Sequence, residues 1–132
     1  MPSTASPLVF ISYSRDNRDV AESFAHALEQ RGIDVWWDRD LPGGSAFADV
    51  LEQRLTEARV VVVLWSAASI RSGFVRDESS RALEAGKLLP VRIEPVVPPL
   101  GFGQIHALDL LDWDGAPDDA QFVAVADAVA RR

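Results

Sequence analysis

Short apolar runs alternate with amphipathic stretches along this chain. The clearest run is VVVVLW at residues 60–65, which is apolar at every position. Such a strand is typical of a parallel sheet that helices cover on both faces, because neither side of the strand meets water. Four more strands are predicted from apolar or β-branched runs, the last of them weaker, at residues 8–13, 33–37, 88–93 and 106–111.

Helical periodicity fills the segments between these runs. Val20, Phe24 and Leu28 recur at i, i+4 and i+8, with Asp16 or Asn17 as a possible cap, and Gly32 stands where a helix commonly ends. Three more helices are predicted, at residues 47–58, 74–86 and 118–131. Residues 94–104 hold three prolines and two glycines and cannot form a regular helix, so the fourth crossover is expected to be degenerate.

This alternation predicts an α/β fold: a flavodoxin-like, doubly wound, five-stranded parallel sheet in the order 2-1-3-4-5, with helices on both faces. Such a sheet has its topological switch between strands 1 and 3, and ligands bind beside it at the carboxyl ends of the strands. The loops at residues 14–17 and 66–73 should therefore flank a crevice, with the loop at 38–45 next to them.

Composition narrows the function classes. A length of 132 residues suits one domain, expected over residues 7–132 after a flexible tail at 1–6. The net charge is −7 and no basic run exceeds two residues, which argues against direct nucleic-acid binding and against an anionic membrane surface. No apolar run approaches the roughly 20 residues of a membrane span, and the start lacks the pattern of a secretory signal. The absence of cysteine excludes disulfides and thiol chemistry and fits a cytoplasmic location.

One carboxylate stands out beside the expected crevice. Glu78 falls in the first turns of the helix after the third strand, and Phe74 lies four residues earlier, on the same predicted helical face. An aromatic ring beside a carboxylate suits a ligand with a flat group and hydroxyls. The alternative is a solvated acid near a helix start, stabilised by the helix dipole.

Other site motifs lack support in the sequence. It contains neither GxGxxG nor a Walker A loop, and His26 and His106 have no metal-ligand spacing. A phospho-acceptor receiver domain has the same strand order, but it would need an aspartate at the end of strand 3, where this chain has Trp65 followed by Ser66.

Three segments, taken in order, resemble the bacterial form of the Toll/interleukin-1 receptor (TIR) domain. They are VFISYSRD at residues 9–16, WDRDLPGG at residues 37–44, and the serine-rich stretch at residues 66–78, which leads to an aromatic residue and a glutamate. The resemblance covers about residues 7–131 and implies a reaction, because many TIR domains cleave the nicotinamide–ribose bond of NAD+. In that case NAD+ is a substrate, and neither a further cofactor nor a metal is expected.

The resemblance also implies roles for individual residues. Glu78 would be catalytic, and Phe74, where the family usually has tryptophan, would stack on a ring of the substrate. Tyr13, Ser14, Arg15 and Ser66 would line the crevice, with Arg15 a candidate phosphate contact. Arg71 and Arg76 are weaker candidates, for which solvated surface arginines are the simpler interpretation.

The loop after the second strand is expected to be an assembly surface. By the resemblance, TIR domains stack head to tail through Asp38, Arg39, Asp40, Leu41, Pro42, Gly43 and Gly44. The simpler alternative is a solvated turn. Leu41 and Phe47 are either partner contacts or core residues, and the helical stripe favours the core for Phe47.

Two functions of different classes follow from these interpretations. The first is an NAD+ glycohydrolase activated by self-association, an effector in bacterial antiphage immunity, with a possible sensor domain or partner beyond residue 132. The second is a non-catalytic TIR interaction module, either an adaptor or a virulence factor. A nucleoside deoxyribosyltransferase is a more distant third, because it has a similar fold and also uses a glutamate at a ribose carbon.

Overall fold

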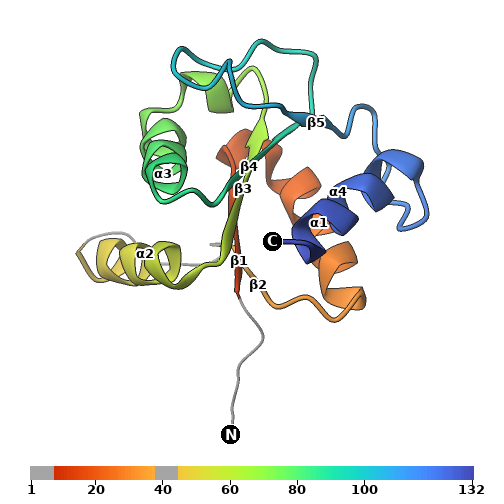
Figure 1. The fold of residues 1–132 in the computed structure, drawn as a ribbon, viewed down its shortest axis with the longest axis horizontal. Coiled ribbons are helices and arrows are strands. Elements are labelled where there is room, and N and C mark those ends of the chain that lie inside the picture. The colour runs from red at the N-terminus through yellow and green to blue at the C-terminus, as the bar shows by residue number, and fades with distance from the viewer. Residues whose placement is uncertain (1–7, 38–44) are drawn as a thin grey trace, which may run out of the picture.

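Five parallel strands form one sheet in the order β2-β1-β3-β4-β5 (Figure 1). The structure, a computed structural model, describes residues 8–37 and 45–132, with the side chains of 45–48 left out. The strands are β1 (Val9–Ser12), β2 (Val35–Trp36), β3 (Val60–Trp65), β4 (Leu88–Arg92) and β5 (Leu108–Asp109). The helices are η1 (Arg15–Asn17), α1 (Arg18–Gln30), α2 (Ser45–Glu57), η2 (Ser69–Arg71), α3 (Gly73–Glu84) and α4 (Ala120–Ala130).

The predicted fold class and strand order are confirmed. The described residues 93–107, which connect β4 to β5, form turns and bends rather than a helix, so the fourth crossover is degenerate as expected. Three predictions lie outside the described residues: the tail at 1–6, the loop from Asp38 to Gly44, and the packing of the Phe47 side chain.

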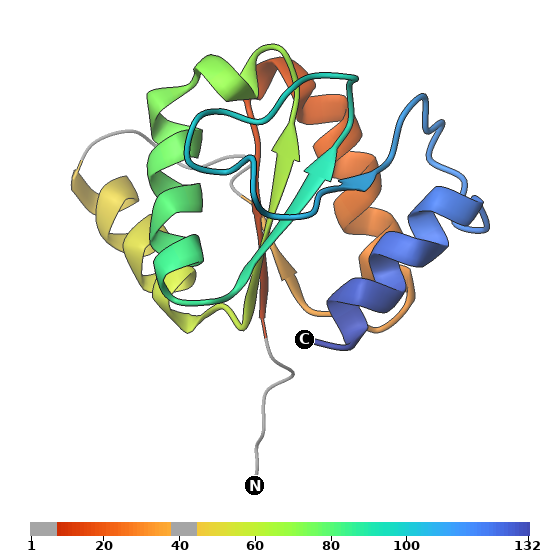
Figure 2. The same cartoon turned by 45° about the horizontal axis from the view of Figure 1, so that its top comes forward.

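Helices cover both faces of the sheet. In Figures 1 and 2, α2 and α3 lie on one side of the strands and α1 and α4 on the other. All six residues of β3 are buried, as expected of a strand in contact with helices on both faces. The alternation along β1 divides the interior into two clusters, because Val9 and Ile11 pack with α1 and α4 while Phe10 packs with α2 and α3.

The end of α1 follows the expected glycine motif. Gly32 has a φ of +81°, and the amides of Gly32 and Ile33 donate to the carbonyls of Glu29 and Leu28. This turn directs the chain into β2. Both β2 and β5 contain only two residues, so each is shorter than the sequence predicts.

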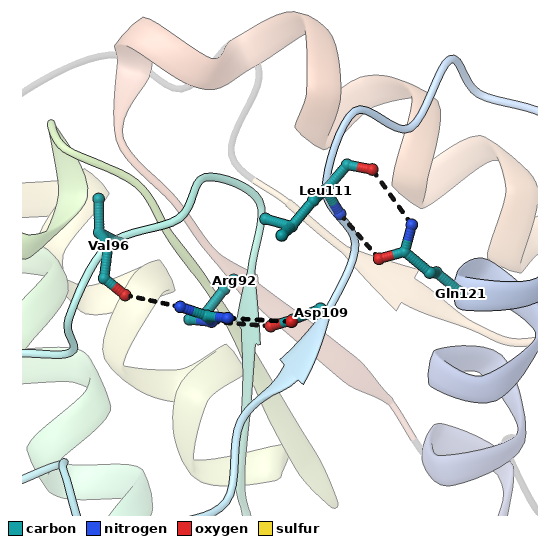
Figure 3. A network of polar contacts seen from close by, with 5 residues as sticks. All are labelled: Arg92, Val96, Asp109, Leu111 and Gln121. Atoms are coloured by element: carbon teal, nitrogen blue, oxygen red, sulfur yellow. Dashed lines mark hydrogen bonds and ion pairs between the residues drawn. The ribbon is translucent and has the colours of Figure 1, made fainter.

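The edge strand β5 is joined to β4 by a bidentate ion pair (Figure 3). The Arg92 guanidinium donates from Nε to Asp109 Oδ1 at 2.7 Å and from Nη2 to Oδ2 at 2.9 Å, and its Nη1 donates to the Val96 carbonyl at 3.2 Å. The Gln121 side chain pairs with the amide and carbonyl of Leu111, which fastens the chain after β5 to α4. These bonds hold a strand that has only two ladder residues.

We expect Asp109→Asn to destabilise the fold in a pH-dependent way. The hydrogen bond from Arg92 lowers the pKa of Asp109, so the carboxylate contributes stability above its unfolded-state pKa of about 3.9 and loses it as pH falls through the lower folded-state pKa. Urea unfolding at a series of pH values should show the parent more stable near pH 7, with the gap closing below about pH 4. The control is Asp118→Asn, which replaces an exposed aspartate. A gap that does not change with pH would contradict this assignment.

Candidate functional site

The carboxyl ends of β1 and β3 lie side by side. Ser12, the last residue of β1, pairs in register with Val63 of β3. The loop after β1 begins at Tyr13 and the loop after β3 at Ser66, so both start from the same edge of the sheet at the switch between β1 and β3. This is the edge at which the sequence predicts a ligand site.

Buried hydroxyls join these two loops. Ser66 Oγ donates to Asn17 Oδ1 at 2.5 Å and accepts from the Ser69 amide at 3.0 Å. Ser69 Oγ accepts from the Ser66 amide at 2.7 Å and donates to the Leu64 carbonyl at 2.8 Å. Asn17 is at the capping position of α1, but its side-chain oxygen binds Ser66 and caps no helix amide. Ser66, predicted to contact substrate, is fully buried, and here its hydroxyl holds the loops together.

The helix α3 begins at Gly73, within one residue of the predicted start, because Ser72 caps it. Ser72 Oγ accepts from the Val75 amide at 3.1 Å, which satisfies one of the free amides of the first turn. The helix then buries one side against the sheet. The residues of that buried stripe are Val75, Glu78, Ser79 and Ala82.

Glu78 is therefore a buried acid. Glu78 is 5% exposed, and its Oε1 accepts a hydrogen bond of 2.6 Å from Ser12 Oγ. A carboxylate taken out of water is stable only where hydrogen bonds or charges replace its hydration. This burial excludes the alternative of a solvated acid at a helix start.

Ser12 was not predicted as a site residue, although the pattern of β1 contains a signal for it. Ser12 follows Ile11 in the alternation of β1, so it shares the face of Phe10, which α2 and α3 cover. A polar side chain at such a buried position needs a polar partner. Glu78, on the helix above that face, provides it.

The other predicted site residues lie around this pair at different depths. Phe74 is one turn before Glu78 on α3, but it is 49% exposed, so the ring lies at the surface and the acid in the interior. Tyr13 packs with the α1 side of the sheet, where its ring centroid is 6.1 Å from that of Trp37. Ser14 accepts from the Asp16 amide at 3.3 Å, and Arg15 is exposed. The structure thus brings Ser12 to Glu78 on the α3 side of the sheet and places Tyr13 on the α1 side.

The connection from β4 to β5 adds a further wall at this edge. Glu94 Oε1 accepts from the Ala67 amide at 2.7 Å, and the ring of Phe102 packs on Trp65 with centroids 5.4 Å apart. Figure 2 shows this segment crossing above the ends of β3 and β4. Val97 and Leu100 on it are exposed.

A groove of about 340 Å³ lies elsewhere, between α1 and Trp37. It is lined by Glu22, Ser23, His26, Glu29 and Trp37. Over residues 8–37 and 45–132, no three potential ligand side chains are grouped so as to hold a metal ion. Within the same residues, no helix is long and apolar enough to cross a membrane.

The fold and the order of the motifs agree with one family. The family model for the TIR domain matches residues 9–125, so the chain belongs to the TIR domain family. A search of curated proteins finds no match to this chain.

Solved TIR structures share the fold. The TIR domain of the Toll-related receptor TRR-2 from Hydra magnipapillata aligns with a TM-score of 0.75 at 19% identity, over 92% of this chain and 97% of that one. A metazoan TIR-STING receptor from C. gigas, in complex with 2′,3′-cGAMP, aligns with a TM-score of 0.72 at 22% identity, over 95% and 42%. The TIR domains of the activated Roq1 resistosome, which recognises the pathogen effector XopQ, align with a TM-score of 0.55 at 28% identity, over 68% and 60%.

We expect Ser66→Ala to lower the free energy of unfolding by about 1–3 kcal/mol, because it leaves the buried amide of Ser69 without its acceptor and removes the bond to Asn17. Urea unfolding monitored by circular dichroism measures the loss. Ser80→Ala, at an exposed position of α3, should change the free energy by no more than about 0.5 kcal/mol. Equal stability of the two variants would show that the serine network does not support the loops.

Proposed function

We propose that this TIR domain is an NAD+ glycohydrolase in which Glu78 is the catalytic carboxylate. The observation that carries the proposal is the buried acid at the carboxyl edge of the sheet, with its Oε1 held by Ser12 at 2.6 Å. The family contains NAD+-cleaving members, and the strand order places this acid beside the switch point where such sheets bind ligands.

Cleavage of the nicotinamide–ribose bond needs a carboxylate but no general acid to protonate the leaving group. The nicotinamide of NAD+ is cationic and leaves as a neutral base, so its departure requires no proton. Positive charge develops on the ribose as the bond to nicotinamide breaks. A carboxylate in a water-poor site stabilises that charge more strongly than it would in water, and it also accepts hydrogen bonds from the ribose hydroxyls. Water then adds to the ribose carbon and releases a proton, which gives ADP-ribose beside the free nicotinamide. A cyclic isomer forms instead where a nucleophile within the ADP-ribose unit takes the place of water.

Surface residues near α3 and η1 supply the binding contacts in this proposal. Phe74, which is 49% exposed, is the candidate to stack on a flat ring of the substrate. Arg15 on η1 is exposed and offers a guanidinium for a phosphate, with Ser14 beside it. Arg71 and Arg76 are also exposed, at the start of the α3 region.

We further propose that self-association switches the activity on. The loop from Asp38 to Gly44 is the assembly surface in this proposal, by its resemblance to the family. Two structural neighbours come from an activated resistosome that recognises a pathogen effector and from a TIR-STING receptor in complex with 2′,3′-cGAMP. By analogy, this domain acts in the cytoplasm as the effector of a bacterial antiphage system, under the control of a sensor domain or partner.

Replacement of the acid tests the reaction. Glu78→Gln should lower the rate of NAD+ loss by about 10²–10³-fold, because a neutral amide does not stabilise the developing cation. The assay follows NAD+ at rising protein concentration and with a crowding agent, since assembly should raise the activity per molecule. Glu84→Gln, an exposed substitution on the same helix, is the control and should keep the parent rate.

The assay also decides between the two classes of function. A parent protein that consumes no NAD+ at any concentration would leave the non-catalytic interaction module as the function. Equal rates for the parent and Glu78→Gln would remove Glu78 from the mechanism. Circular dichroism of each variant verifies that it is folded.

The Phe74 ring should contribute binding rather than bond cleavage. Phe74→Ala is expected to lower kcat/KM about fivefold, the equivalent of ~1 kcal/mol of stacking, and Phe74→Trp should match or exceed the parent. Initial rates of nicotinamide release at varied NAD+ measure the change. Leu83→Ala, which truncates another exposed apolar residue of α3, is the control. A kcat/KM for Phe74→Ala equal to that of the control would exclude stacking on Phe74.

A further inference from the structure

We propose that Ser12 is the positioning residue for Glu78: its hydroxyl sets the direction of the carboxylate without touching the substrate. The inference rests on the proposed NAD+ cleavage and deepens it. Its basis is the bond of 2.6 Å between Ser12 Oγ and Glu78 Oε1, which joins residues 66 positions apart in the sequence.

The donor belongs to a rigid part of the fold. Ser12 ends β1, a strand with neighbours on both sides, and it pairs with Val63 in the parallel ladder to β3. The residue is 1% exposed, so its side chain has no route to a bound substrate from this position. A serine side chain has a single rotatable bond to its oxygen, and burial restricts it further. The hydroxyl is therefore a fixed reference point for the acid.

The acceptor needs such a reference point. The carboxylate of Glu78 is three rotatable bonds away from the backbone of α3, and the capping bond of Ser72 fixes that backbone but not the side chain. A hydrogen bond from a hydroxyl to an ionised carboxylate is shorter and stronger than one between neutral groups, and 2.6 Å lies within its usual range. The bond determines which carboxylate oxygen faces β1 and hence how the carboxylate plane is oriented.

This arrangement has a kinetic signature. Stabilisation of a developing charge depends on groups that are already oriented when the bond breaks, and a small displacement is costly. Ground-state binding, in contrast, depends on the ring and phosphate contacts at the surface. Loss of the Ser12 hydroxyl should therefore lower kcat and leave KM almost unchanged.

The test compares variants of the assembled protein in the nicotinamide-release assay. Ser12→Ala should lower kcat by about 10–100-fold, the value of a hydrogen bond to a charged group, with less than about a twofold change in KM. The threonine side chain of Ser12→Thr and the valine side chain of Ser12→Val have the same shape, but only threonine has a hydroxyl. Only the threonine variant should therefore retain activity. This pair also decides the outcome if the alanine variant does not fold.

A buried serine on α3, next to Glu78 in the sequence, provides the matched control. Ser79 is fully buried, and among the described residues its hydroxyl has no hydrogen-bond partner. Ser79→Ala removes the same atom from the neighbouring position and should keep the parent kcat. A parallel fall in kcat for Ser79→Ala and Ser12→Ala would assign the effect to general loosening of α3 and overturn the inference.

The outcomes separate this inference from the proposed function. Parent activity with an undiminished kcat for Ser12→Ala would overturn the positioning role and leave NAD+ cleavage in place. A parent without NAD+ turnover would overturn both. The hydrogen bond itself is tested without turnover by a double-mutant cycle in urea unfolding with Ser12→Ala and Glu78→Ala, each of which removes one partner of the bond. The two changes together should destabilise less than the sum of the two single changes, and additivity would contradict the geometry.

Discussion

The burial of one carboxylate constrains the centre of this domain. A carboxylate loses most of its hydration in the protein interior. The lost hydration free energy has to be offset by hydrogen bonds from oriented polar groups. The Ser12 hydroxyl is one such group, at 2.6 Å from Glu78 Oε1. Its position depends on β1 lying between β2 and β3, and the position of Glu78 depends on the stripe of α3 that packs on the sheet. Strand order, helix packing and the acid are thus parts of one arrangement.

The rest of the edge is held by short polar contacts between loops. The serine network joins the loop after β3 to Asn17, and Glu94 joins the same loop to the connection after β4. These contacts give the loops at this edge of the sheet a defined arrangement before any ligand is bound. Pre-organisation of this kind favours charge stabilisation over binding of the ground state, because few groups have to move during the reaction.

Much of the fold could be predicted from the sequence because the local pattern of apolar, polar and turn residues in these elements matches their burial and backbone conformation. The uninterrupted apolar run of β3 and the glycine turn at Gly32 each have a single physical interpretation, and both were confirmed. The short edge strands were predicted too long, because apolar residues beside them, such as Ile33, Trp37 and Leu110, pack in or against the core cluster although they lie outside the strands. The start of α3 at Gly73, after the cap by Ser72, lies within one residue of the predicted start near Phe74.

The candidate site was harder to predict than the fold. Glu78 was identified through spacing and resemblance, but its burial depends on tertiary packing that no local pattern encodes. Ser12 was missed because a serine at the end of an apolar run looks like the end of a strand. Asn17, one of two residues predicted as a possible helix cap, instead accepts from Ser66, since a long-range partner competes with the local one. The substrate contacts of Tyr13, Ser14, Arg15, Ser66 and Phe74 remain predictions.

We propose that Glu78 promotes cleavage of the nicotinamide–ribose bond, and proton NMR of NAD+ incubated with concentrated protein is a sensitive test of that role. The anomeric signal of the nicotinamide ribose and the signals of free nicotinamide report on that bond alone. With the parent, the anomeric signal should decay and free nicotinamide should appear, whereas with Glu78→Gln both signals should stay constant over the same time. An unchanged NAD+ spectrum with the assembled parent, or equal decay with both proteins, would contradict that role.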